Sequence, residues 1–244
     1  SSLNHLNELH FIRSPGIDMP LLLQRATCLR EVTFTDCQVE ISAMLRAAFN
    51  TSIHSIHIEG SYLRADFGVD FQLTTSLDVI HLPGCHFLGD SLYSLLILLV
   101  QLQSSTMKLS IDLTDLVSES DSWKQLFSPT TLAALSLTEL IWNHNEIFPG
   151  FFEYLATCPL LSKLSLVGCN IPPEPLSRYL STGSMLVELN ISETGPHLIE
   201  PLGMAQQLST VIYESSRLGV QGLCKFASVV NNSKSIRTIS CFNN

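Results

Sequence analysis

Three histidines occupy equivalent places in short apolar segments and are the first candidates for chemistry. His10, His57 and His81 each have an apolar residue on both sides. In an extended strand those apolar neighbours point to one face and the histidine points to the other. We expect His57 and His81 to be neighbours on adjacent strands, with only His54 and Glu59 close to them. A transition metal needs three or four ligands, so the spacing favours a polar, pH-sensitive contact surface over a metal site.

Seven cysteines offer a second possible chemistry. No two of them form a C-x-x-C pair, which excludes a zinc knuckle and a thioredoxin-type motif. Cys37, Cys85 and Cys169 follow apolar segments at the same spacing, where a small side chain with weak hydrogen-bonding capacity is needed. No Lys or Arg stands next to them in the sequence to lower a thiol pKa. We therefore predict reduced, structural thiols, as in the cytosol, and interpret Cys28 and Cys158 in the same way.

Motifs for catalysis are missing from the sequence. It contains no G-x-S-x-G, H-E-x-x-H, G-x-x-x-x-G-K-[ST] or G-x-G-x-x-G pattern. Asp112 and Asp115 are close in sequence, but strand residues share a face only at even spacing, and Asp115 falls beyond the strand. Trp142 falls on a predicted core position. We expect a protein that is not an enzyme and that carries no cofactor and no metal.

An internal repeat supplies the elements that must position these residues. Its pattern is apolar-x-x-apolar-x-apolar-x-x-(Asn/Cys/Ser/Thr)-x-apolar, with copies that start at residues 6, 29, 53, 77, 108, 137, 161, 186, 208 and 236. The spacing between starts runs from 22 to 31 residues. A fixed period of this length is the mark of a solenoid, in which each copy is one supersecondary unit.

Each copy predicts a short strand, a turn and a helix. In the copy that starts at Leu29, Val32 and Phe34 point to one side of a strand, and the small polar side chain of Cys37 serves backbone groups at the turn. Helix-period stretches follow such turns, for example Ile41, Met44, Leu45 and Phe49, or Leu92, Leu95, Leu96 and Leu99. Neither element can bury its apolar face alone, so stacking gives parallel strands inside and helices outside. Leu166 is predicted to pack between Leu140 and Leu189 of the neighbouring copies.

Two stretches depart from the regular pattern. The copy that starts at Lys108 is weak and is assigned on Ile111 and Leu113 as its second and third apolar residues. Residues 114–122 carry Asp115, Glu119 and Asp121 among several serines and predict a solvated loop. Residues 1–244 are expected to form a single domain of about ten repeats. Because solenoids need polar caps and neither end supplies one, this domain is interpreted as a piece of a larger protein.

The pattern resembles leucine-rich repeats, in particular the helical, cysteine-tolerant class of the ribonuclease inhibitor. Residues 109–113, 122–127, 172–176, 208–213 and 219–222 are similar to segments in the repeat domain of CARMIL-type regulators of actin capping protein. The resemblance implies an α/β horseshoe, with parallel strands on the concave face and helices on the convex face, and a role in the actin cytoskeleton. In that family the capping-protein-binding motif lies in a basic tail after the repeats. This chain has no such tail, so the resemblance assigns that activity to none of its residues.

Charge and hydropathy narrow the classes of partner. The chain has 13 basic and 22 acidic residues and a net charge of −9. Such a chain gains nothing from counterion release on a phosphate backbone, so neither nucleic acid nor an anionic membrane surface is expected as a partner. The longest apolar run, residues 95–100, is far shorter than the roughly 20 residues of a membrane span. The first residues lack the basic and apolar regions of a signal peptide, so we expect a cytoplasmic protein.

The remaining candidate site is the outward face of the predicted strands. We predict protein-binding residues at Asp36, His57, Glu59, His81, Asp112, Asn143, Glu188, Asn190 and Glu214. None of these is Lys or Arg, so a protein partner with a basic segment is expected. One alternative is an acidic face that is only solvated. Another is a GTPase-activating or innate-immune-receptor-type repeat domain, for which Arg64 is the candidate to reach a nucleotide.

Overall fold

The computed structural model describes residues 5–14, 21–22, 26–48, 51–65, 77–102, 108–114, 135–182 and 184–244. The predicted loop with Asp115, Glu119 and Asp121, and the similarity at residues 122–127, lie outside these ranges. The chain is an α/β protein that divides into two compact units. The first unit comprises Ser1–Asp112 with Val117–Ser136, and the second comprises Leu113–Leu116 with Leu137–Asn244.

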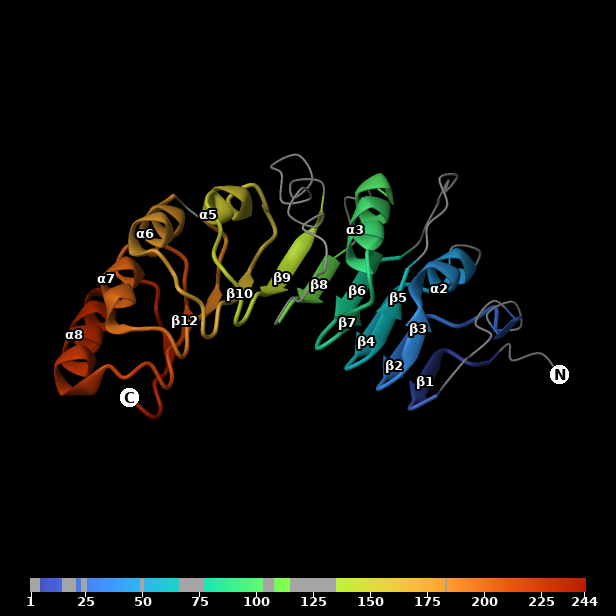
Figure 1. Cartoon of the computed structure of the whole chain (residues 1–244), viewed down its shortest axis with the longest axis horizontal. Coiled ribbons are helices and arrows are strands. Elements are labelled where there is room, and N and C mark those ends of the chain that lie inside the picture. The colour runs from blue at the N-terminus through green and yellow to red at the C-terminus, as the bar shows by residue number, and fades with distance from the viewer. Residues whose placement is uncertain are drawn as a thin grey trace. The chain divides into compact units, whose positions relative to one another are not determined.

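The first unit contains a parallel sheet with one strand from each repeat. Its strands follow the chain order β1 (Glu8–Ile12), β2 (Glu31–Thr35), β4 (Ser55–Glu59), β6 (Val79–Leu82) and β8 (Lys108–Asp112). A smaller parallel sheet follows the turns, in the order β3 (Gln38–Glu40), β5 (Tyr62–Arg64) and β7 (His86–Phe87). Helices α2 (Ile41–Ala48) and α3 (Ser91–Leu102) lie on one side of the main strands (Figure 1).

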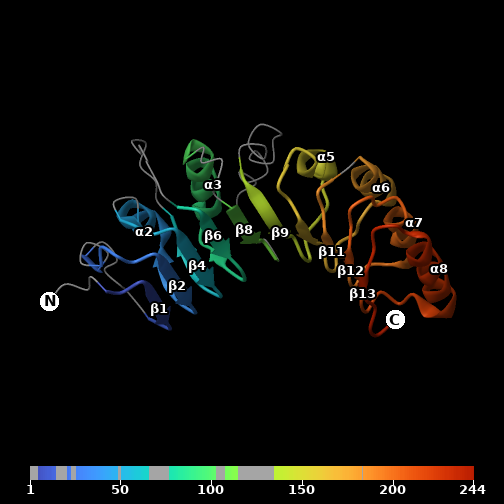
Figure 2. The same ribbon diagram turned by 180° about the vertical axis from the view of Figure 1, so that it is seen from behind.

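The second unit has a corresponding sheet, in which every strand after the first is three residues long. Its strands are β9 (Leu137–Ile141), β10 (Lys163–Ser165), β11 (Glu188–Asn190), β12 (Thr210–Ile212) and β13 (Thr238–Ser240), all parallel and in chain order. The helical segments are α5 (Phe151–Leu155), α6 (Pro173–Ser181), the 3-10 helix η2 (Pro196–Leu198), α7 (Ile199–Leu202) and α8 (Gly219–Asn232). Figure 2 shows these helices together on one side of the unit's strands.

The helices bury the residues that the helical period predicts. Ile41, Met44 and Leu45 of α2 are at most 1 % exposed, which is the apolar stripe of an amphipathic helix. The carboxylate of Glu40 accepts the backbone N–H groups of Ser42 (3.2 Å) and Ala43 (3.0 Å) at the start of this helix. Those two groups have no partner within the helix, so the glutamate also fixes where the helix begins.

The strands bury the predicted apolar positions on the side that faces the helices. Leu29, Val32, Phe34, Cys37 and Val39, one complete copy of the pattern, are each at most 5 % exposed. The alternation of buried and half-buried residues along β2 and β4 is the period-2 pattern of a strand with one covered face. Burial declines in the last copy, where Ile236 is buried but Ile239 is 40 % exposed, because β13 is the last strand of its sheet.

The repeat that starts at Lys108 differs in phase from the prediction. In the pairing of β6 with β8, Leu109 lies opposite Ile80 and Ile111 lies opposite Leu82. Leu109 and Ile111 are therefore its second and third apolar residues in the first unit, not Ile111 and Leu113. Leu113 is buried in the second unit, where its N–H donates a 2.8 Å hydrogen bond to the carbonyl of Ile141.

The polar turn residues bond the backbone as the pattern predicts. The side chain at this position donates to a carbonyl of the preceding copy. In four of the five cases that carbonyl belongs to the third apolar residue, and in the fifth it belongs to Leu113, two residues beyond Ile111. These bonds run from Cys37 to Phe11 (3.6 Å), Cys85 to Ile58 (3.0 Å), Asn145 to Leu113 (2.6 Å), Cys169 to Trp142 (3.1 Å) and Asn244 to Tyr213 (2.5 Å). We call this set the turn ladder. It pairs carbonyl groups that the chain reversal would otherwise leave buried without a partner.

Candidate functional site

The first strand face is the side of the first unit's sheet that its helices leave uncovered. Strand register arranges its side chains in columns that cross the strands. One column holds Glu8, Glu31, Ser55, Val79 and Lys108, and the next holds His10, Thr33, His57, His81 and Ser110. A third begins with Ile12, Thr35 and Glu59. All of these side chains are exposed or half-buried.

The predicted pairing of two histidines is confirmed. His57 lies opposite His81 in the register of β4 and β6, with ring centroids 5.5 Å apart in an edge-to-face arrangement. His57 Nε2 is 2.8 Å from Ser55 Oγ and 3.8 Å from a carboxylate oxygen of Glu31. His54 is directed elsewhere, with Nδ1 3.4 Å from Asp78. The imidazole rings of His57 and His81 can therefore donate or accept a hydrogen bond and stack against a group of a partner.

The three predicted carboxylates of the first unit differ in what they contact. Asp36 forms an ion pair with Arg13 (Oδ2 to Nε, 3.3 Å). Asp112 Oδ2 accepts a 2.9 Å hydrogen bond from the backbone N–H of Gly84, so it supports a turn. Glu59 is exposed at the end of β4. Asp36 and Asp112 therefore have structural partners, and Glu59 is the carboxylate best placed to meet a ligand.

Sequence reasoning missed the carboxylates at the start of the strands. Glu8 and Glu31 lie next to one another in the register of β1 and β2, with side chains 68 % and 39 % exposed. They stand one residue before the second apolar position of their copies, which is an outward position by the same period-2 rule. Lys108 occupies the equivalent position on β8, so the face also holds a cation.

The second strand face is the corresponding surface of the second unit. Its first column reads Glu139, Lys163, Glu188, Thr210 and Thr238, and its second reads Ile141, Ser165, Asn190, Ile212 and Ser240. Lys163 lies between Glu139 and Glu188 in register. This alternation of sign makes the column less acidic than the predicted residues alone indicated.

Hydrogen bonds within the chain engage the other predicted residues of the second face. Asn143 Oδ1 accepts from Ser165 Oγ and from the N–H of Val167, both at 2.8 Å. Asn190 Oδ1 accepts a 2.8 Å bond from Ser192 Oγ. A carboxylate oxygen of Glu214 accepts from Ser240 Oγ. Asn143 and Glu214 therefore link neighbouring copies, and Asn190 fixes the turn that follows its own strand, so all three stabilise the face as well as forming part of it.

Arg64, the residue considered for a nucleotide, lies at the end of β5 in the small sheet. It is exposed and stands opposite Glu40 in register.

The thiols and carboxylates form no metal centre in the part of the chain that the structure describes, since no group of three or more His, Cys, Asp or Glu residues there could hold an ion. None of the helices described is long and apolar enough to cross a membrane.

No protein-family model matches the sequence, and no curated protein matches it.

Proposed function

We propose that this chain is a leucine-rich-repeat solenoid of the horseshoe type that acts as a non-enzymatic scaffold for binding another protein in the cytoplasm. The observation that carries the proposal is the uncovered strand face, where polar side chains recur in register on rigid parallel strands. Repeat proteins use such broad surfaces, built from equivalent positions of successive copies, to bind extended partners. The resemblance to CARMIL-type repeat domains points to the actin cytoskeleton as the setting.

The partner proposed is a protein segment rich in Lys or Arg. On the first strand face, Glu8, Glu31 and Glu59 are exposed or half-buried, and Lys108 is the cation in the same columns. On the second face, Lys163 separates Glu139 from Glu188. On the first face Glu8 and Glu31 are direct neighbours with no cation between them, so its negative charge is more concentrated and it is the preferred docking site. Complementary charge mainly increases the rate of association and selects the partner.

A peptide of twelve residues that alternates Arg and Ser tests the proposal. The double variant Glu31→Gln, Glu59→Gln removes two charges from the first face and keeps side-chain size. A control double variant, Glu146→Gln with Glu174→Gln, removes the same charge from exposed residues elsewhere in the chain. Biolayer interferometry at low salt should show binding that weakens about 3- to 30-fold for the first variant only. Equal weakening in both variants would mean that the peptide binds the acidic chain non-specifically, and this result would contradict a docking site on the first face.

The rival proposal, a GTPase-activating domain, has its own assay. It expects the chain to accelerate GTP hydrolysis by a small GTPase and expects Arg64→Ala to abolish that acceleration. Acceleration across a panel of small GTPases would replace the scaffold proposal. Its absence, together with charge-specific peptide binding, supports the scaffold.

A further inference from the structure

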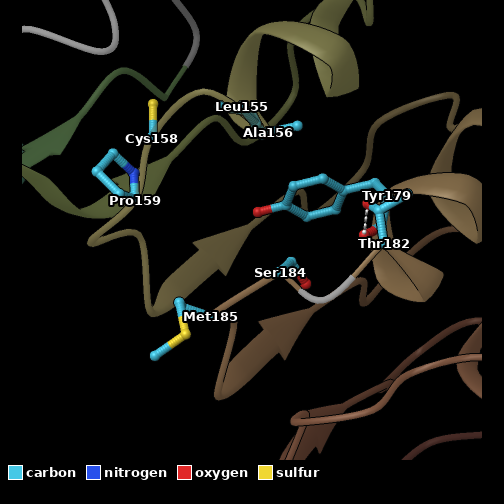
Figure 3. A pocket seen from close by; sticks show the side chains of 8 residues that line it. All are labelled: Leu155, Ala156, Cys158, Pro159, Tyr179, Thr182, Ser184 and Met185. Carbon is cyan, nitrogen blue, oxygen red and sulfur yellow. Dashed lines mark hydrogen bonds between the residues drawn. The ribbon is translucent and has the colours of Figure 1, made fainter.

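A pocket of about 100 Å³ opens in the second unit between the segment that ends α5 and the segment that ends α6. Leu155, Pro159 and Met185 supply its apolar walls, and Cys158, Tyr179 and Ser184 supply its polar groups. Figure 3 shows the Tyr179 ring extending from α6 into the space between these segments, with its hydroxyl directed away from the helix. The pocket is separate from the second strand face and has no role in the function proposed above.

Tyr179 presents a hydroxyl donor to this pocket, as Ser184 does from the opposite segment. Tyr179 is 4 % exposed, and its ring packs against Phe152 with the ring centroids 5.8 Å apart. Burial raises the pKa of this tyrosine, so its hydroxyl stays protonated. Among the described residues, no group forms a hydrogen bond with that hydroxyl. Every fully buried side-chain nitrogen or oxygen of the described residues has a partner, so this unbonded hydroxyl lies open to the pocket, where a bound ligand can accept from it.

The lining excludes a charged ligand. None of the described residues that line the pocket is Asp, Glu, Lys, Arg or His. Burial raises the pKa of the Cys158 thiol to about 12, so that group is neutral as well. An ion placed here would lose its hydration without gaining a counter-charge, which is strongly unfavourable. The ligand must therefore be neutral.

The volume limits the ligand to a small group. A cavity of about 150 Å³ accepts benzene, so this pocket fits about five or six non-hydrogen atoms. We propose that it binds a compact aliphatic group that carries one carbonyl oxygen, with the carbonyl accepting a hydrogen bond from Tyr179 and the hydrocarbon lying against Leu155, Pro159 and Met185. Two sources share this chemistry, namely a free small ketone or lactam and an aliphatic residue of a bound peptide.

Methionine methyl groups provide the readout. In chain labelled with ¹³C at the methionine methyls, Met185 reports on the pocket, while the buried Met44 of the first unit is an internal reference. Cyclopentanone and methylcyclopentane are the matched probes, because both have six non-hydrogen atoms and only the ketone has an acceptor. N-acetyl-valine methylamide represents the peptide source. Ligands of this size bind with affinities in about the millimolar range.

The variant Tyr179→Phe removes the hydroxyl and keeps the ring, and Tyr154→Phe on α5 is the matched control. We expect Met185 to shift with cyclopentanone, and Tyr179→Phe to weaken that binding about 3- to 10-fold with no effect on methylcyclopentane. A shift with the valine derivative alone, sensitive to the same variant, supports the proposal and assigns the peptide source. No movement of Met185 with any probe, or equal weakening of ketone and hydrocarbon, overturns it. Unchanged thermal unfolding of Tyr179→Phe confirms that the variant is folded.

Discussion

The thiol of Cys169 donates a 3.1 Å hydrogen bond to the backbone carbonyl of Trp142, one repeat earlier in the chain. Both residues are at most 4 % exposed, so water does not replace this bond. Burial raises the pKa of Cys169, which keeps the thiol protonated and able to donate. The contact joins two consecutive copies of the repeat, so it links local turn geometry to the stacking of the second unit.

Removing this donor should destabilise the second unit. Cys169→Ala leaves the carbonyl of Trp142 without the partner and should lower the free energy of unfolding by about 1–3 kcal/mol. Cys169→Ser keeps a donor, and Ser61 and Ser216 already occupy the same position in other copies, so its loss should be smaller. Urea unfolding measures both, with Cys224→Ala on exposed α8 as the control. Equal losses for Ala and Ser would mean that packing, not the hydrogen bond, matters here.

In the turns that the structure describes in full, the residue just before the polar turn residue adopts a left-handed backbone. At Gly168 φ is 66°, and a Cβ added there would lie 2.3 Å from Nδ1 of His144. Gly168→Ala should therefore cost backbone strain, about 1 kcal/mol, together with the displacement of the imidazole. Adding His144→Ala should restore the free energy lost by displacing the imidazole, but not the free energy lost to backbone strain. A double-mutant cycle by urea unfolding checks this, and strict additivity would contradict the contact.

The fold was largely predictable because burial follows the strand and helix periods. Residues 29–35 and 53–59 have apolar side chains only where the pattern needs them, so only one phase fits. The copy at Lys108 was ambiguous because Leu109, Ile111 and Leu113 alternate without a break, and pairing with β6 selects the first two. Strand register also decides which core residues of neighbouring copies meet. Leu166 is buried as predicted, but Leu140 and Leu189 lie opposite Leu164.

The candidate site was less predictable because long-range partners decide what an outward side chain does. The pairing of His57 with His81 followed from one shared position in two copies. Nothing in the sequence indicated that Arg13 would pair with Asp36, or that Asp112 would bond the turn at Gly84. Nor did it indicate that Ser192 would be buried with its hydroxyl accepting the N–H of Glu214 at 3.0 Å. Tyr179 fits the helical period, which carries no signal that its hydroxyl opens onto a pocket.

Thiol reactivity should separate the cysteines by burial. Cys28, Cys224 and Cys241 are exposed, whereas Cys37, Cys85, Cys158 and Cys169 are buried. At pH 8 a neutral maleimide should modify the exposed three quickly and the other four only at the rate of local opening, because the folded chain keeps the reagent from their sulfur atoms. Mass spectrometry of the time course identifies the sites, and denaturation should release all seven. Fast labelling of Cys85 in the folded chain would contradict its burial in the turn ladder, and fast labelling of Cys158 would contradict its burial at the pocket.

Stability should fall in alkaline solution. Burial raises the pKa of Cys85 and Cys158 from 9.0 to about 12. Between those values the unfolded chain releases thiol protons that the native chain retains, so the unfolded state binds fewer protons and stability decreases as pH rises. The loss should be about 1 kcal/mol per thiol at pH 10, relative to pH 8. Urea midpoints at several pH values test this, and Cys158→Ala should flatten the slope while Cys224→Ala leaves it unchanged.

Salt should control how fast the first strand face recognises a basic segment. Glu31 lies 3.8 Å from His57, whose ring meets that of His81 edge to face, so two imidazoles stand beside the carboxylates proposed to attract the partner. Raising the salt concentration should slow the association of an Arg-rich peptide with the wild type, because screening acts on these carboxylates. The double variant Glu31→Gln, Glu59→Gln should associate more slowly at low salt, and its rate should depend less on salt. The double variant Glu146→Gln, Glu174→Gln in the second unit should behave like the wild type. Stopped-flow fluorescence with a labelled peptide gives the rates. An unchanged salt dependence in the first double variant would move the docking site away from this face.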